Sequence, residues 1–552
     1  VQQERAFTFR TVSVLESVVL RSFGPEGGQV LFTRDTGQAM LSRSGIRILS
    51  ALRLEHPLAR MVVECVLKHS SVTGDGSKTF VLLLASLLRM IYTMACKKAN
   101  VSRTHNTRDA AAAATARRLA DELLTFASKE LEKLIVMGVV PYGYSLSWDD
   151  FTAVTRLPCY TDHHCVQKLL ASFFHTRLSA SHCDIVTNLT CDLLTRWKFK
   201  NDQPSSSLQF VNDNFPALHT CVLGFSVTSS HLIEGQVIHK DFATPCPHTD
   251  NQPVKAVVFT GYLEPNLIVQ FKAWAERSLS CVIANLQRLG VSVLLSAVKQ
   301  SAAVLTVAQH ADMCVVECID EDELSLFSIL SSFFVLFHRY VHVSFNHLDE
   351  RDTFKPCSLV ICGPGEGQTD QYACAFQDAV RMLLSTWEPT AKASKKTLQS
   401  NTGTSLHTNN QMCSVSLLEP GCVISAGGTF EFLLNHVLLQ HGRSRSVSDG
   451  KSVAIPEVSQ LLADALLSVP RQIYSHRMQC FLQTQARLLK ADTTSKVFML
   501  KLGLESVSCK YRLFLAVLQC VSSLLQVDTV LHTQSHRLKN ISWEGSDDEA
   551  DV

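Results

Sequence analysis

The sequence predicts a multidomain α+β chain in which two mainly helical regions enclose an α/β unit. Three observations support this fold class: apolar residues recur at helical spacing over residues 1–135, strand-like and helical segments alternate over residues 210–345, and a second helical region covers residues 421–528. At about 150 residues per domain, the 552 residues correspond to three or four folding units. We therefore expect a helical body assembled from both chain ends around an inserted α/β unit.

The N-terminal region contains four predicted helical segments, the last of them over residues 107–136. Apolar residues predict a helix over residues 11–23, which the glycine-rich turn at residues 24–28 ends. Pro57 stands at the first position of a second, amphipathic helix that ends before Gly74. The apolar run over residues 80–96 is too short to span a bilayer and predicts a buried helix, so we expect no transmembrane segment.

The middle of the chain has the pattern of an α/β unit with partly parallel strands. Strands are predicted over residues 254–260, 291–295 and 313–317, with a helix over residues 274–289 between the first two. Residues 389–410 are polar and predict a loop.

Composition limits the class of partner and the compartment. Lys and Arg total 51 against 50 Asp and Glu, and the formal charge of +1 argues against a protein that grips nucleic acid over a broad basic face. The 19 cysteines are scattered, several within apolar helical stretches, which is typical of reduced core residues. We expect a protein of the cytosol or nucleus that does not bind nucleic acid.

The sharpest local motif is Gly74-Asp75-Gly76-Ser77-Lys78-Thr79, between two predicted helices. Its glycines allow close approach of a ligand, and Ser77 and Thr79 can cap the next helix while backbone N–H groups face an anion. Asp75 would repel a bare phosphate, so a phosphate site requires Mg²⁺ between them. The alternative is an ordinary helix–helix turn, which these six residues alone favour. The motif is not a Walker loop, because Lys78 follows Ser77.

Two further motifs favour ordinary structural roles. Residues 363–367 are rich in glycine after an apolar strand, and a strand-ending turn explains them without a nucleotide. Cys159, His163, His164 and Cys165 are zinc-type ligands, but their spacing lacks the paired knuckles of a zinc site. We interpret them as an exposed helix start.

Taken together, these and other short motifs resemble the group II chaperonins, the family of the archaeal thermosome and the eukaryotic cytosolic ring chaperonin. The matching segments lie at residues 23–27, 55–61, 74–77, 376–383, 426–431, 463–470 and 524–528. The resemblance implies a mainly helical equatorial domain, an intermediate hinge domain and an α/β apical domain that binds substrate. The implied boundaries are 1–135 and 411–535 (equatorial), 136–215 and 346–410 (intermediate, the latter with the polar linker), 216–345 (apical) and 536–552 (acidic tail).

Within that family the chain is most similar to the divergent vertebrate chaperonin-like proteins of Bardet-Biedl syndrome, through residues 54–63, 74–80, 339–342 and 503–507. This likeness implies a chaperonin-like assembly factor. Its implied partners are sister chaperonin-like proteins, cytosolic ring chaperonin subunits and subunits of the coat complex that traffics membrane proteins to cilia. The implied place is the cytoplasm, at the centrosome or basal body and the cilium base.

The family's nucleotide site carries over in part. The resemblance places the Mg²⁺-phosphate aspartate at Asp75 and the water-activating aspartate at Asp378, whereas Ser44 stands where the family has another aspartate. ATP and Mg²⁺ are the implied cofactors. The implied nucleotide contacts are Gly24, Pro25, Gly74, Gly76, Ser77, Lys78, Thr79, Gly427, Gly428 and Glu505.

The loss of one carboxylate can cost roughly 10²–10⁴ in rate, so we expect weak ATP binding and slow or absent hydrolysis. Lys78 has two expected roles: it stands in for a cation at the phosphates, or it pairs with Asp75 and closes an empty site.

A competing hypothesis is an autonomous ATP-hydrolysing ring that folds cytosolic proteins. That ring requires strands at residues 6–10 and 527–533 to pair between subunits. A third hypothesis treats residues 546–551 as a phosphorylation-controlled docking segment.

Overall fold

The structure is a computed structural model. The residues it describes are 2–24, 26–33, 37, 39–99, 105–146, 165–198, 204–244, 255–264, 272–330, 334–337, 342–346, 356–388, 418–448, 454–490 and 503–527. Several predictions fall outside these residues: Pro25, three of the four zinc-type ligands (Cys159, His163 and His164), the polar loop 389–410, the strand expected beyond residue 527 and the acidic tail.

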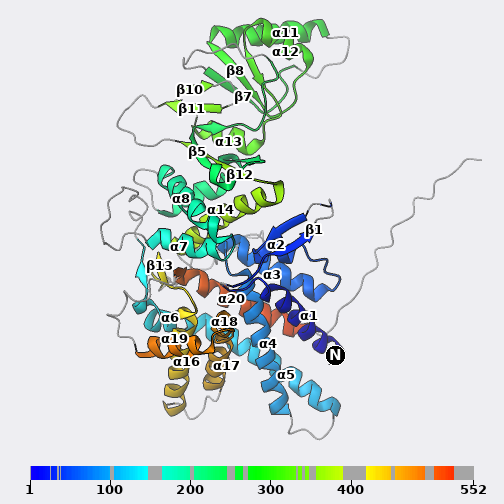
Figure 1. The fold of residues 1–552 in the computed structure, drawn as a ribbon. Helices are drawn as coiled ribbons and strands as arrows, with labels where there is room; N and C mark the ends of the chain where they lie inside the picture. Colours follow the sequence, from blue (N-terminus) through cyan, green and yellow to red (C-terminus); the bar gives the residue numbers. More distant parts are fainter. Residues whose placement is uncertain are drawn as a thin grey trace, which may run out of the picture.

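The lower body in Figure 1 is formed from both ends of the chain. Its N-terminal helices are α1 (Gln2–Leu20), α2 (Gly45–Ser50), α3 (Pro57–Thr73), α4 (Ser77–Ala99), α5 (His105–Phe126) and α6 (Glu132–Gly138). Its C-terminal helices are α16 (Thr429–Ser448), α17 (Ala454–Leu466), α18 (Ser468–Ile473), α19 (Met478–Lys490) and α20 (Val507–Gln526). A hairpin of β1 (Val30–Thr33) and β2 (Ala39–Ser42) lies between α1 and α2 in the chain. We call this assembly the helical body.

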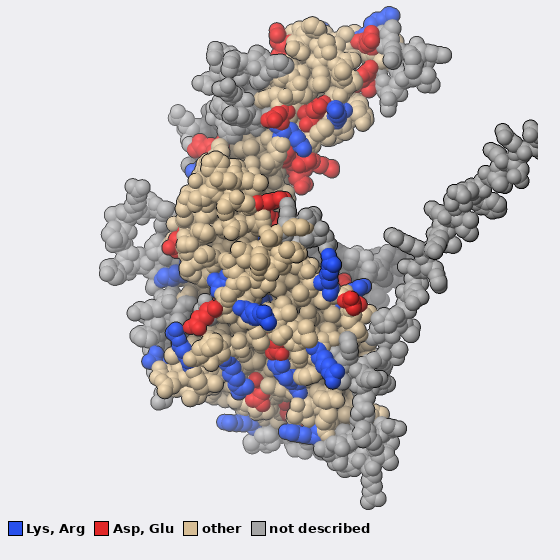
Figure 2. Space-filling view, turned by 45° about the vertical axis from the view of Figure 1, so that its right-hand side comes forward, with Lys and Arg blue, Asp and Glu red and all other residues tan. Residues whose placement is uncertain are grey.

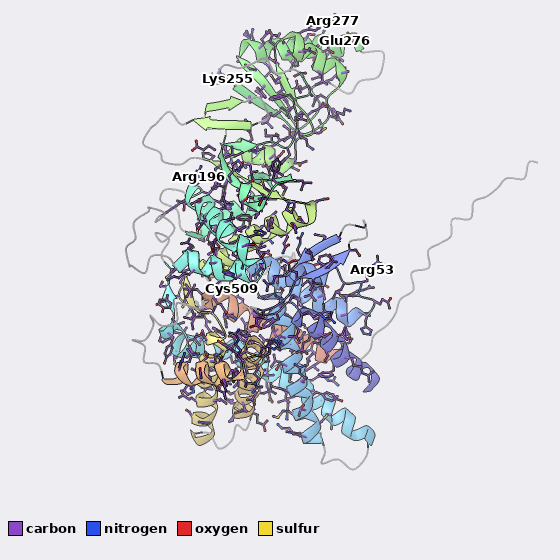
Figure 3. All side chains as sticks on the ribbon, in the orientation of Figure 1. Arg53, Arg196, Lys255, Glu276, Arg277 and Cys509 are labelled. Atoms are coloured by element: carbon purple, nitrogen blue, oxygen red, sulfur yellow. The ribbon has the colours of Figure 1, made fainter. Side chains whose placement is uncertain are left out.

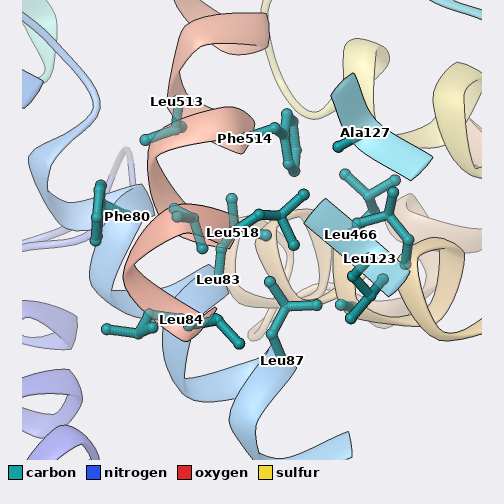
Figure 4. Packing of buried hydrophobic residues seen from close by; sticks show 14 of the residues in the cluster. Phe80, Leu83, Leu84, Leu87, Leu123, Ala127, Leu466, Leu513, Phe514 and Leu518 are labelled. Carbon is teal, nitrogen blue, oxygen red and sulfur yellow. The ribbon is translucent and has the colours of Figure 1, made fainter. Parts of the chain in front are cut away.

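One continuous hydrophobic core holds the helical body together (Figure 4). Phe80, Leu83 and Leu87 of α4 lie together with Phe514 and Leu518 of α20, all of them buried. Burial of one such side chain contributes roughly 1.5–3 kcal/mol. The core therefore depends on contacts between opposite ends of the sequence.

Among the described residues, α4 and α20 have the length and apolar composition of a membrane-crossing helix. The apolar run over residues 80–96 lies within a longer helix of 23 residues, so the length of the helix alone does not exclude a span. However, 61% of the apolar window of α4 and 67% of that of α20 are buried in the core. This packing is that of core helices, as predicted for residues 80–96.

The strand expected at residues 6–10 is wrong, because these residues belong to α1, which begins at Gln2. Residues 2–6 are Gln-Gln-Glu-Arg-Ala, which favour helix, and no proline or glycine interrupts residues 2–20, so the helix continues through residues 7–9. The helices predicted from residue 11 and from Pro57 are confirmed, and α3 ends directly before Gly74, as expected.

A central body of helices and one mixed sheet lies above the helical body (Figure 1). Its helices are α7 (Cys165–His175), α8 (Ala180–Arg196), α9 (Pro204–Asp213), α10 (Phe215–Leu218) and α14 (Glu366–Trp387). In the sheet, β12 (Cys357–Gly363) pairs in parallel with β4 (His219–Leu223) and antiparallel with β5 (His231–Glu234). The indole N–H of Trp197 donates to the carbonyl oxygen of Cys357 at 3.0 Å and fixes α8 against β12.

A small sheet and the start of α20 join the central and helical bodies. Three remote segments form the sheet: β13 (Cys422–Ser425) pairs with both β14 (Leu504–Ser506) and β3 (Tyr144–Ser145). Cys509, labelled in Figure 3, donates its Sγ hydrogen to the carbonyl oxygen of Met382 in α14 at 3.7 Å. Burial raises the pKa of the Cys509 thiol to about 11, so it is an inert core residue.

The upper body contains the predicted α/β unit. Strands β7 (Lys255–Phe259), β8 (Val291–Ser296) and β9 (Cys314–Val316) form a parallel sheet, which confirms the strand prediction. The helices of this body are α11 (Lys272–Arg288), α12 (Ala302–His310) and α13 (Glu321–Leu330). A separate sheet contains β10 (Phe334–Phe337), β11 (His342–Asn346) and β6 (Gln236–Val237).

Leu294 of β8 packs with α11 and α12, whereas Leu295 packs with Phe327 of α13, so the parallel sheet has a core on each face. The α+β class and the helical, α/β, helical order are confirmed. The exact domain boundaries stay a prediction.

Charged side chains are dispersed over the face shown in Figure 2, with both signs interspersed among large uncharged areas. The described part of this face carries no extended field of one sign, in keeping with the near-zero formal charge.

Candidate nucleotide site

The motif at residues 74–79 forms the turn between α3 and α4. Gly74 and Gly76 both adopt left-handed backbone conformations, with φ of 66° and 83°, which only glycine adopts without strain. The hydroxyl of Thr73 donates to the carbonyl oxygen of Asp75 at 3.1 Å and closes the turn. Ser77 and Thr79 fall in the first turn of α4. The turn is thus rigid, and it places Asp75 directly before a helix N-terminus.

His69 of α3 contacts this turn through Thr73. Its Nε2 atom lies 3.2 Å from the Thr73 hydroxyl, and its ring contacts the Phe80 ring with centroids 5.9 Å apart. Burial lowers the pKa of His69 to about 4, against the opposing pull of the Asp75 charge. The imidazole is therefore neutral at physiological pH.

Close packing of Gly74 against α14 brings Asp75 and Asp378 to the same place. Asp378 is buried in α14, and its Oδ1 lies 3.3 Å from Nη1 of Arg381. Burial raises the pKa of Asp378 to about 6, although the charges of Arg177 and Arg381 pull it down. The two aspartates that the resemblance selects, 303 residues apart in the sequence, thus belong to one site.

Ser44 also lies at this site. It is the N-cap residue of α2, and a Cβ atom on the following Gly45 would lie 2.5 Å from Oγ of Ser77. A cavity of about 10 Å³ lies between α2, Arg177 and α14, with room for about one water molecule. The residues that line it are Ser44, Arg47, Arg177, Gln371, Cys374, Ala375 and Asp378.

Arg177, between α7 and α8, is a site residue that the sequence analysis missed. Its Nη2 donates to Oδ1 of Asp75 and to the carbonyl oxygen of Gly74, both at 2.8 Å. Burial acts to raise the pKa of Asp75, but the Arg177 charge and hydrogen bond outweigh it and hold that pKa below its usual value. The only local signal is an arginine two residues beyond the end of an amphipathic helix, which does not specify a partner 102 residues away.

Lys78 takes a different partner from the one expected. Its ammonium donates to the carbonyl oxygens of Ser22 at 2.7 Å and of Thr176 at 3.5 Å, while Asp75 is paired with Arg177. Of the two roles considered for Lys78, pairing with Asp75 is not the one that its hydrogen bonds show. Burial, and then the charges of Arg177 and Arg43, lower the pKa of Lys78 to about 7.

The N-terminal glycine turn adjoins Lys78 through Ser22. Gly24 has a φ of 78°, and its carbonyl oxygen accepts from the Gly27 N–H at 3.2 Å. The next residue, Pro25, lies outside the described residues. Gly24 thus lies two residues after Ser22, whose carbonyl oxygen accepts a hydrogen bond from Lys78 of the site.

The remaining predicted contacts form a neighbouring cluster. Gly427 donates its backbone N–H to Oε1 of Glu505 at 3.4 Å, and a Cβ atom on Gly428 would lie 2.8 Å from Cβ of Pro470. Nζ of Lys510 lies 2.6 Å from Glu505 and 2.8 Å from Glu431. Burial raises the pKa of Glu505 although Lys510 opposes it. The charge of Lys510 also lowers the pKa of Asp75, so a cation of this cluster acts electrostatically on the turn at residues 74–79.

The residues present do not fit a Mg²⁺ ion held by Asp75. Oδ1 of Asp75 already accepts from a guanidinium, and Ser44 supplies a hydroxyl in place of a carboxylate. A nucleotide-bound Mg²⁺ takes one or two protein carboxylates besides phosphate oxygens and water, and the Asp75 carboxylate is already engaged by Arg177. Mg²⁺ prefers several anionic or neutral oxygens at close range, whereas the nearby cations repel it.

Comparison with known proteins agrees with the resemblance noted from the motifs. The TCP-1/cpn60 chaperonin family model matches residues 15–331. The BBSome complex assembly protein BBS10 of Mus musculus and that of Homo sapiens are each 25% identical to this chain over 98% of both chains.

More local matches connect the chain to ring chaperonins. The T-complex protein 1 subunit alpha of Tetrahymena pyriformis is 31% identical over 88 residues, 16% of each chain. A thermosome subunit of Methanothermococcus thermolithotrophicus is 30% identical over 76 residues, 14% of each chain. Because the family model covers more than half of the residues, the chain belongs to the TCP-1/cpn60 chaperonin family.

Proposed function

We propose that this protein is a chaperonin-like assembly factor for the BBSome, the ciliary coat complex, and that it hydrolyses ATP slowly or not at all. The observation that carries the assembly role is the end-to-end match to proteins named for BBSome assembly, which covers 98% of both chains. The partners we propose are sister chaperonin-like proteins, cytosolic ring chaperonin subunits and BBSome subunits. The proposed location is the cytoplasm near the basal body and cilium base.

The geometry of the site supports the proposal that hydrolysis is slow. Phosphoryl transfer depends on positioned charge, and a general base or metal ligand typically contributes 10²–10⁴-fold. Here Ser44 replaces one carboxylate and Arg177 neutralises Asp75. Nucleotide binding is a general property of the family, but this set of residues offers little for turnover.

The assembly role is tested by mild affinity capture of the full chain from ciliated cells, followed by size separation. We expect recovery in a large complex with ring chaperonin subunits and BBSome subunits. Recovery as a homo-oligomeric ring without these partners would overturn the proposal and support an autonomous folding machine.

The catalytic part is tested separately with purified protein. We expect ATP turnover at least about 10²-fold below that of a competent ring chaperonin. The control is the Asp75→Ala variant, which separates turnover at this site from a contaminating ATPase. Turnover at the competent rate that Asp75→Ala abolishes would contradict the proposal.

A further inference from the structure

Three consecutive residues between α7 and α8 make polar contacts with the helical body. The carbonyl oxygen of Thr176 accepts from Lys78 at 3.5 Å, and the carbonyl oxygen of Leu178 accepts from Arg43 at 3.4 Å. Between them, the side chain of Arg177 reaches Gly74 and Asp75. We call residues 176–178 the 176–178 segment. The segment accepts hydrogen bonds from Lys78 and Arg43 and donates hydrogen bonds to Gly74 and Asp75, all of them in the helical body.

The guanidinium of Arg177 is held rigidly before it meets Asp75. Its Nη1 donates to the Thr176 hydroxyl at 2.9 Å and to the carbonyl oxygen of Phe173 at 3.3 Å. Its Cζ lies 3.6 Å from the centroid of the Phe173 ring, a cation–π arrangement. Arg177 is buried, whereas the side chain of Asp75 is 46% exposed, so solvent reaches the ion pair from the carboxylate side only.

The backbone of Arg177 is fixed as well. Its carbonyl oxygen accepts from Nε2 of Gln371 in α14 at 3.1 Å, and Gln371 is itself buried. The arginine is thus anchored in the central body, while its charge lies in the turn of the helical body. An ion pair of this kind holds two parts of a fold together only while both partners stay in place.

A divalent ion with a nucleotide would bring a positive charge to Asp75 from solution and release it again. Arg177 supplies that charge permanently, because a guanidinium does not deprotonate in proteins. On the side of Arg177 that faces Asp378, the cavity of about 10 Å³ has room for one water molecule.

We propose that the 176–178 segment is a built-in latch, in which Arg177 replaces metal and nucleotide as the link between the central and helical bodies. The joint therefore stays closed without ATP. The latch depends on the contacts at the candidate site and not on the BBSome-assembly role, so either proposal can fail without the other.

The test is hydrogen–deuterium exchange of the purified full chain with and without MgCl₂ and ATP. In the wild-type protein we expect equal protection of residues 70–80 and 173–180 in both conditions. Arg177→Gln removes the charge, and we expect amides in both segments to exchange at least about tenfold faster. The matched control is Arg196→Gln on α8, which removes an exposed arginine 3.8 Å from Glu234 and should leave both segments unchanged.

A second variant covers the case in which Arg177→Gln does not fold. Asp75→Asn removes only the partner's charge and should also raise exchange in both segments. Combining it with Arg177→Gln, where that variant folds, should add little, because the two residues form one interaction. Protection that increases on addition of MgCl₂ and ATP to the wild type, or unchanged exchange in the variants, would overturn the latch.

Discussion

A Cβ atom built on Gly74 would lie 2.0 Å from the carbonyl oxygen of Asp378. No real Cβ atom approaches a backbone oxygen so closely, so α14 sits at this distance from the α3–α4 turn only because residue 74 has no side chain. The contact fixes where Asp75 stands relative to α14. A single glycine therefore sets the geometry of the candidate site.

Gly74→Ala should destabilise the protein by at least about 2 kcal/mol, because it combines this clash with a left-handed φ of 66°. Urea denaturation followed by circular dichroism measures the change. The control is Gly365→Ala at the N-cap of α14, where the backbone is extended and a Cβ atom meets nothing within 4 Å. Equal stability of the two variants would show that α14 can move away from the turn.

His69 should make the protein less stable in mild acid. Its pKa is about 4 in the folded chain against 6.5 when exposed, so between these values the unfolded chain binds a proton that the folded chain does not. The free energy of unfolding should therefore fall as pH falls from 6.5 towards 4, by up to about 3 kcal/mol.

The measurement is a series of urea denaturations across that pH range. His69→Leu should flatten the dependence, while replacement of the exposed His476 by Gln should not. Thr73 keeps its bonds to the carbonyl oxygens of residues 69 and 75 in the first variant, so no buried hydroxyl is left unpaired. An unchanged slope in His69→Leu would contradict this assignment.

Asp378 and Asp75 should respond in opposite directions to loss of their charge. The pKa of Asp378 is raised to about 6 in the folded chain, so its stabilising contribution is present below 3.8 and is lost as pH rises through 6. Asp378→Asn should thus increase stability at pH 7 by up to about 3 kcal/mol, with no difference from the wild type below pH 4.

The pKa of Asp75 is lowered, so its contribution is present above 3.8 and is lost as pH falls. Asp75→Asn should therefore destabilise the protein at pH 7. Thermal unfolding of both variants at pH 7 and pH 4 measures the pair. Destabilisation by Asp378→Asn at pH 7 would show that its bond to Arg381 outweighs the cost of burial.

Lys510→Met should be strongly destabilising, because it leaves Glu431 and Glu505 without their shared cation. Glu431 is fully buried, and breaking a buried pair typically costs 3–5 kcal/mol. The control is Lys98→Met, which removes a more exposed pair with Glu457 and should cost at most about 1 kcal/mol. Similar midpoints of urea unfolding for both variants would mean that the two glutamates become protonated at little cost.

Periodic sequence features allowed most of the helical body and the parallel sheet to be predicted. The face of α1 that carries Val12, Leu15 and Val19 is buried as its spacing indicates, because burial of an apolar stripe is a local rule. The strand expected at residues 6–10 rested on pairing between subunits, and within one chain the helix-favouring residues 2–5 and the amphipathic stretch from residue 11 extend the helix through them.

The sequence identified the two aspartates of the candidate site but not the arginine that contacts one of them. Motif resemblance selects Asp75 and Asp378, which have family counterparts, but it does not select Arg177, whose partner is set by tertiary structure. The choice between Arg177 and Lys78 as the cation beside Asp75 depends on where the loop after α7 lies. No periodicity or spacing within either segment encodes that position.

The shared core of α4 and α20 has a consequence for synthesis of the chain. The ribosome adds roughly 400 residues after α4 ends at Ala99 before α20 is complete at Gln526. At about 5–20 residues per second, α4 waits about 20–80 s for its packing partner. Throughout that interval, a helix as apolar as a membrane span lacks the part of its cover that α17 and α20 supply, while α1, α3 and α5 are available to pack on it. A member of a chaperone family is thus expected to need a holding chaperone of its own during translation.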